Sequence, residues 1–170
     1  VLLRAWTMDD LGCVEEASGD PDIPTGTTVP AAYTPAEGAA WIERQWGRAE
    51  TGEGISLAIT DAPSDEALGA AVLLAKPQRG SASLGYWMIP RARRRGLATR
   101  AVGLLVRWAV GDGGLHRVEA VVEVGNVASQ RVLETNGFQR EGQLRSYLSF
   151  RKGRADALMY SLLPRDLGYE

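Results

Sequence analysis

The stretch GYWMIPRARRRGLA (residues 85–98) joins an apolar segment to the start of a helix through a loop rich in arginine. Gly85 to Ile89 is typical of a strand, and Pro90 ends it because proline has no amide for the next ladder bond. From Ala98 to Val110, apolar residues recur at helical spacing. The start of a helix offers free backbone amides, which bind phosphate groups well. The stretch therefore predicts an anion-binding loop inside a mixed α/β domain.

Outward from this loop, the spacing of apolar and turn-forming residues predicts one α/β (α+β) domain over residues 1–170, built on a mixed, mostly antiparallel sheet. Seven strands are expected at 2–5, 55–60, 67–75, 82–89, 116–123, 138–150 and 154–163. Four helices are expected at 7–17, 34–51, 98–110 and 126–136. Residues 18–34 are rich in Gly, Pro, Asp and Thr, which predicts a long surface loop.

Two helices carry clear local signals. Thr34 and Glu37 form a capping box around Pro35 at the first helical position. The helix over 98–110 places several apolar side chains on one face, among them Trp108. Both segments should therefore be amphipathic helices packed on the sheet.

Composition restricts the classes of function. The chain has 170 residues, 45% of them hydrophobic, and a formal net charge of -2, which argues against a protein whose main partner is nucleic acid. It contains no run of about 18 apolar residues that could cross a membrane, and its single cysteine, Cys13, cannot form an internal disulfide. These features lead us to expect a protein of the cytoplasm that does not bind a membrane.

Several motifs resemble a known family. Arg93, Gly96 and Ala98 match the R/Q-x-x-G-x-G/A signature of the GCN5-related N-acetyltransferases (GNAT). Downstream, LHRVEA (115–120), NVASQRVLE (126–134) and NGF (136–138) follow in the order that is similar to the RimJ/RimL branch of that family. The sequences at 85–87 and 160–162 also resemble it. The resemblance is close over roughly residues 67 to 163, and the N-terminal third agrees only in pattern.

This resemblance implies an acetyl-CoA site. The strand before the loop should splay from the strand that begins at His116, and the pantetheine arm should lie in the gap between them. Backbone amides of the loop should hold the diphosphate, while its arginines attract the anion. The expected cofactor-binding residues are Met88, Ile89, Arg93, Arg94, Arg95, Gly96, Leu97, Ala98, Thr99, Asn126 and Ser129.

The resemblance also implies direct transfer of an acetyl group to a primary amine in a ternary complex. Many relatives place at Leu133 a tyrosine that protonates the leaving thiolate, which leaves Ser129 as the candidate for this role. Relatives commonly carry acids at the positions of Ser83 and Ser146. Glu119 is the remaining candidate for the general base, and a structural ion pair with an arginine is the alternative. Asn126 has the alternative role of a helix N-cap.

The acceptor amine belongs to a protein N-terminus or to a small molecule, and we expect Asp20, Asp22 and Tyr33 to lie beside it. The alternative function is an inactive acyl-CoA sensor or assembly domain, for which the absence of acids at 83 and 146 is the best support. Cys13 and His116 are interpreted as structural, and no zinc-ligand spacing occurs. Proteins of this type commonly form homodimers; the helix around Trp41 and Trp46 and the last strands are candidate contacts, which the sequence leaves open.

Overall fold

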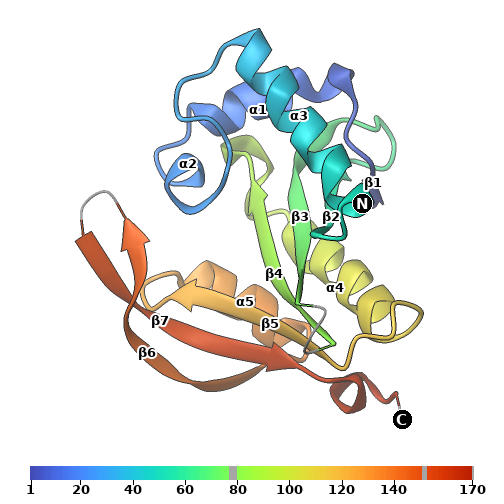
Figure 1. The fold of residues 1–170 in the computed structure, drawn as a ribbon, viewed down its shortest axis with the longest axis vertical. Coiled ribbons are helices and arrows are strands. Elements are labelled where there is room, and N and C mark those ends of the chain that lie inside the picture. Colours follow the sequence, from blue (N-terminus) through green and yellow to red (C-terminus); the bar gives the residue numbers. More distant parts are fainter. Residues whose placement is uncertain (77–79, 151–152, 170) are drawn as a thin grey trace.

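A computed structural model describes residues 1–76, 80–150 and 153–169 and shows seven strands in one sheet, in the order β1-β2-β3-β4-β5-β7-β6 (Figure 1). The strands are β1 (Leu2–Arg4), β2 (Gly54–Thr60), β3 (Ala67–Lys76), β4 (Ser81–Met88), β5 (Arg117–Glu123), β6 (Gln139–Phe150) and β7 (Gly153–Leu162). The helices are α1 (Leu11–Ser18), α2 (Ile23–Gly26), α3 (Pro35–Glu50), α4 (Leu97–Val110) and α5 (Val127–Thr135).

The sheet is mixed, as the sequence predicts, because β4 and β5 run parallel while the other neighbouring strands pair antiparallel. The parallel register runs from the pair Ser81–Arg117 to the pair Ser83–Glu119. Beyond these residues β4 continues along β3 and β5 continues along β7, so the two central strands diverge (Figure 1). The splayed pair expected from the resemblance is therefore present.

Helices cover both faces of the sheet. Successive side chains of a strand point to opposite faces. In β4, the Trp87 ring lies 6.2 Å from the Trp41 ring of α3, whereas the neighbouring Tyr86 reaches Ser129 on α5. Helices α3 and α5 therefore lie on opposite faces of β4. Helix α4 shares the face of α5, because the Asn136 side chain that follows α5 donates to the Thr99 carbonyl of α4 at 3.0 Å.

Three details differ from the sequence expectations. Residues 23–26 form the short helix α2 within the segment expected to be a loop, so the described part of the chain has five α-helices where four helices were expected. Trp41 is only 2% exposed and packs against Trp6 in the core, whereas Trp46 is 41% exposed. Of the two tryptophans considered for a dimer contact, Trp41 therefore lies in the core and only Trp46 is exposed. Trp108 is also exposed, because the buried face of α4 is centred on Val102 and Ala109.

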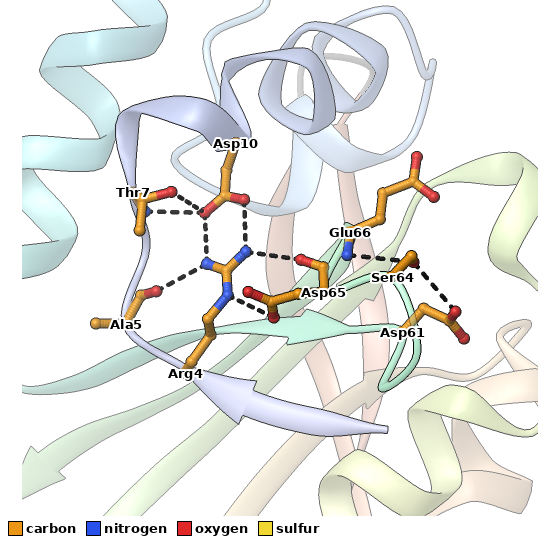
Figure 2. A network of polar contacts seen from close by, with 8 residues as sticks. All are labelled: Arg4, Ala5, Thr7, Asp10, Asp61, Ser64, Asp65 and Glu66. Carbon is orange, nitrogen blue, oxygen red and sulfur yellow. Dashed lines mark hydrogen bonds and ion pairs between the residues drawn. The ribbon is translucent and has the colours of Figure 1, made fainter.

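Arg4 fixes the N-terminal segment to the turn between β2 and β3 (Figure 2). Its guanidinium donates to both carboxylate oxygens of Asp10 at 2.8 and 2.9 Å, and its Nε donates to Asp65 at 2.9 Å. Within the turn, the Ser64 hydroxyl donates to Asp61. These contacts hold the acidic turn over residues 61–66 against the N-terminal segment, and Arg91 and Arg95 of the loop that follows β4 reach the same turn.

Candidate functional site

The loop between β4 and α4 has an unusual backbone. Arg94 and Gly96 adopt the left-handed conformation, with φ of 60° and 68°. Gly96 is the N-cap of α4 and no side chain caps this end of the helix. Since the first helical amides have no partner within a helix, the amides of Leu97, Ala98 and Thr99 are available to a ligand. The loop thus ends in a helix start of the kind that can bind an anion, at the position where the sequence predicts one.

Most of the arginines in this loop already contact carboxylates. Arg91 pairs with Glu16 and Glu66 at 2.9 and 2.8 Å, and Arg95 lies 3.9 Å from Asp61. Arg93 bridges two elements: its Nε donates to the Met88 carbonyl at 3.0 Å, and its Nη2 pairs with Asp20 at 2.8 Å. Backbone amides therefore supply most of the local attraction for an anion, and these three arginines shape the loop.

The gap between β4 and β5 exposes backbone of β4. The Ile89 amide donates to the Leu68 carbonyl of β3 at 3.0 Å. In an antiparallel pair, residues that bond to the partner strand alternate with residues whose backbone groups face away from it. The amides of Tyr86 and Met88 therefore face the gap, whereas the Ile89 amide is occupied. This edge can pair with the amides of an extended ligand.

Helix α5 begins at the edge of this gap. The Asn126 carboxamide accepts a hydrogen bond from the Ser129 amide at 3.0 Å, which is the N-cap that the sequence offered as the alternative for Asn126. The Ser129 hydroxyl lies 2.6 Å from the Tyr86 hydroxyl, and Tyr86 also donates to the Ser129 carbonyl at 3.1 Å. Two hydroxyl groups thus meet where the strands separate.

The far end of α5 is anchored by a second tyrosine. Tyr160 of β7 is 1% exposed, and its hydroxyl donates to Glu134 at 2.9 Å. Leu133 is completely buried and contributes to the core. The position that carries a tyrosine in many relatives therefore fills apolar space here, and the hydroxyl groups near the gap come from Tyr86 and Ser129.

Glu119 is held in an ion-pair network. Lys76 and Arg117 both donate to its carboxylate, and these two hydrogen bonds lower its pKa. Arg117 also pairs with Glu141. Glu119 stands opposite Ser83, where β4 and β5 are still hydrogen-bonded. This arrangement favours the structural ion pair that the sequence allowed for Glu119, since a carboxylate with a lowered pKa is a weak base.

Ser146, the other position considered for an acid, lies in β6, where the register with β7 is interrupted. Its backbone is left-handed, with φ of 53°, and its amide donates to Asp156 at 2.7 Å. The carboxylate that contacts Ser146 is therefore that of Asp156. Hydrogen bonds from the Ser146 amide and from Gln143 lower the pKa of Asp156.

The three residues expected beside the acceptor are positioned differently from one another. Asp20 is buried, and its carboxylate accepts from the amides of Asp22 and Ile23 as well as from Arg93. Asp22 is exposed and precedes α2. The Tyr33 ring packs close to Gly38 of α3, and burial raises the pKa of its hydroxyl. Of the three residues, Asp20 is thus buried, Tyr33 is half-buried and Asp22 is exposed.

Cys13 and His116 lie away from the gap. Cys13 is buried on α1, and burial raises the pKa of its thiol to about 12. His116 precedes β5 at the closed end of the strand pair, where its amide donates to Gly80. Over residues 1–76, 80–150 and 153–169, no group of three His, Cys, Asp or Glu side chains could hold a metal ion. No helix within those ranges is long and apolar enough to span a membrane.

Two neighbours of the site were not identified from the sequence. Tyr86 was noted only as part of a motif, although its alternation with the buried Trp87 indicates that it points to the other face. Arg100 lies four residues after Gly96, and its guanidinium is 3.3 Å from the point where a Cβ of Gly96 would stand. That spacing places a cation above the loop.

Known proteins share this sequence and architecture. A family model described as acetyltransferase (GNAT) domain matches residues 1–139. N-acetyltransferase YoaA from Bacillus subtilis (strain 168) is 32% identical over 167 residues, which cover 97% of this chain and 82% of YoaA. The structure of Mycobacterium smegmatis RimJ in complex with CoA-disulfide has a TM-score of 0.86 at 22% identity, covering 99% of this chain and 84% of that chain. RimL, a ribosomal L7/L12 alpha-N-protein acetyltransferase solved with coenzyme A, has a TM-score of 0.81 at 19% identity, covering 95% and 92% of the two chains. The chain therefore belongs to the GNAT acetyltransferases and is an N-acetyltransferase that uses acetyl-CoA as its cosubstrate.

Proposed function

We propose that this acetyltransferase passes the acetyl group to a primary amine, of a protein N-terminus or of a small molecule, by direct attack within a ternary complex. The observation that carries the proposal is the open edge of β4 between the anion-binding loop and the Ser129 hydroxyl. A channel of this kind accepts a long thioester whose diphosphate is far from its sulfur. Acetyl-CoA supplies the activated acyl group, and the chain supplies orientation and hydrogen-bond donors.

The residues present fit CoA. The amides of Leu97, Ala98 and Thr99 are free to hold the diphosphate, and the left-handed Arg94 and Gly96 turn the backbone toward it. The amides of Tyr86 and Met88 are available to the pantetheine amides. In this arrangement Arg93 supports the site through the Met88 carbonyl, and Ile89 ends the strand.

Ser129 is the proposed donor to the leaving sulfur. Its hydroxyl lies in the first turn of α5, and a helix N-terminus stabilises nearby negative charge. Asn126 keeps this turn in place through its N-cap. A serine hydroxyl is too weak an acid to give up its proton easily, so hydrogen bonding to the developing thiolate is its proposed contribution.

Direct attack is supported by the state of Cys13, the single cysteine of the sequence, which is poorly suited to act as a nucleophile. The thiol of Cys13 has a pKa of about 12 and is buried, so little thiolate forms near neutral pH. Holding amine and thioester in line can supply much of the rate, because alignment is worth roughly 7–11 kcal/mol in favourable reactions.

The test is release of free thiol from acetyl-CoA in the presence of a panel of small amines and of peptides with free N-termini. We expect turnover with at least one class, and the class with the higher kcat/KM identifies the acceptor. Binding of CoA without turnover on any member of the panel would contradict the proposal and favour the sensor function.

A further inference from the structure

Tyr86 forms a contact that anchoring alone does not explain. Its hydroxyl has a single proton and two neighbours, the Ser129 carbonyl at 3.1 Å and the Ser129 hydroxyl at 2.6 Å. A carbonyl can only accept, whereas a hydroxyl can donate or accept. The pair therefore has two arrangements, which differ in the direction of the Ser129 proton.

In the first arrangement, Tyr86 donates to the carbonyl and the Ser129 hydroxyl donates back to Tyr86. In the second, Tyr86 donates to the Ser129 hydroxyl, which leaves the serine proton free to point into the gap. The two arrangements interconvert by rotation of two hydroxyl groups, and neither hydroxyl loses its proton. A negatively charged atom in the gap that can accept a hydrogen bond, such as a thiolate sulfur, favours the second arrangement. Hydrogen bonds to charged groups are stronger than those between neutral groups.

Tyr86 is well placed to remain a donor. It comes from β4, on one side of the gap, and Ser129 comes from α5, which borders the other side. Burial raises the pKa of Tyr86 to about 12, against the opposing effect of the hydrogen bond with Ser129. The phenol thus keeps its proton at neutral and mildly alkaline pH.

We propose that Tyr86 is a positioning residue that directs the Ser129 proton toward the sulfur of departing CoA. The inference rests on the proposed role of Ser129 and adds a second hydroxyl to it. A donor that itself accepts a hydrogen bond is polarised and donates more strongly. The two hydroxyl groups should consequently act as one unit.

The first test measures the pKa of the thiol of CoA bound to the enzyme, from the ultraviolet absorbance of the thiolate across a pH series. We expect Tyr86→Phe and Ser129→Ala each to raise that pKa relative to wild type, by up to about one pH unit, because each weakens hydrogen bonding to the thiolate. This measurement needs no acceptor amine, so it can be read even if the acceptor class is assigned wrongly. A thiol pKa at the wild-type value in Tyr86→Phe overturns the proposal.

The second test is kinetic. Tyr86→Phe should lower kcat roughly twofold to tenfold, with KM for acetyl-CoA nearly unchanged. In the double variant with Ser129→Ala, the additional loss should be close to zero, since the phenol acts through the serine. Multiplicative losses in the double variant overturn the proposal. A wild-type kcat in Ser129→Ala instead contradicts the role of Ser129 and, with it, this inference.

The matched control is Tyr160→Phe, which removes the hydroxyl that anchors the other end of α5. If Tyr86 only held α5 in place, the two phenylalanine variants would change thermal stability and KM in the same way and leave the bound thiol unaffected. That result overturns the proposal. A raised thiol pKa in Tyr86→Phe, with a wild-type value in Tyr160→Phe, supports it.

Discussion

Arginine residues in the loop after β4 make their contacts within the chain, including the arginine that belongs to the motif. Arg93 matches the family signature, yet its guanidinium contacts the Met88 carbonyl and Asp20 within the chain. The charge of Arg91 is likewise balanced by Glu16 and Glu66. At this scale, the proposed anion site would depend chiefly on backbone amides, whose direction is set by two left-handed residues.

Gly96→Val is expected to abolish measurable CoA binding in calorimetry while the fold persists. A side chain in the left-handed conformation costs roughly 1–2 kcal/mol, and relief of that strain would turn the loop amides away from the diphosphate. The control is Gly52→Val, which also has a positive φ, of 74°, and open space around it, at the end of α3. Equal CoA affinity in the two variants would refute the assignment of the loop.

Glu119→Gln is expected to leave kcat within a few-fold of wild type. The carboxylate is paired with Lys76 and Arg117, so the substitution should reduce stability and not remove a base. Its folded pKa is lowered, so the stabilising contribution is present above the unfolded pKa and disappears as the pH falls through the folded value. A drop in kcat of about a hundredfold or more, the range of general-base catalysis, would show that this expectation is wrong.

Helix α5 is the element that carries Ser129, the proposed donor to the leaving sulfur. Its N-terminus is fixed by the Asn126 cap and its far end by Tyr160 and Glu134. The diverging strands β4 and β5 open the gap beside it. The two anchors of α5 and the divergence of the strands thus determine where the first turn of α5 lies relative to the exposed edge of β4.

Asn126→Ala is expected to lower the free energy of unfolding by about 1 kcal/mol, because the Ser129 amide loses its cap. Asn126→Ser retains a capping oxygen and should be nearly as stable as wild type. Denaturant unfolding and CoA titration on both variants separate the two roles of Asn126. If Asn126→Ser is stable but binds CoA much more weakly, Asn126 contacts the cofactor in addition to capping the helix.

At the scale of the whole molecule, Arg93 and Asp20 link the end of β4 to the segment between α1 and α2, across 73 residues of sequence. On the opposite face from α5, Trp6, Trp41 and Trp87 form a cluster with ring separations of 4.9 to 6.2 Å. Because Arg93 contacts both Asp20 and the Met88 carbonyl, the segment between α1 and α2 is attached to the same strand that borders the gap.

Asp20→Asn is expected to lower the free energy of unfolding at neutral pH by about 1–3 kcal/mol, since a partly buried charge-assisted hydrogen bond is lost. Burial alone would raise the pKa of Asp20, but the amides of Ile23 and Asp22 and the Arg93 guanidinium outweigh burial and lower it. The stabilisation is therefore present above the unfolded pKa and lost as the pH falls through the folded one.

Denaturant unfolding of wild type and Asp20→Asn from pH 7 to below pH 4 measures this effect. The difference in stability should shrink at acidic pH, because wild-type Asp20 then becomes neutral as well. Asp22→Asn serves as the control, since its side chain is exposed. A stability difference that is constant over the whole pH range would contradict the role of the Asp20 charge.

Local patterns in the sequence were sufficient to predict the order of strands and helices. The N-cap of α3 is one example: the Thr34 hydroxyl accepts a hydrogen bond from the Glu37 amide, as the capping box predicts. Helix α2 was missed because a single turn has too few residues to show a period. Trp108 was expected on the packed face of its helix but is exposed, because periodicity predicts the direction of an apolar face and not how many side chains that face buries.

The sequence by itself determined the order of the strands and the longer helices, the position of the arginine loop between β4 and α4, and the family, because caps, periods and motif spacing are local properties of the chain. Only the tertiary structure decided which side chains meet. Tyr86 and Ser129 are 43 residues apart, and their contact depends on the divergence of β4 from β5 and on the docking of α5. No local pattern encodes such a contact, since it results from sheet register and helix packing together.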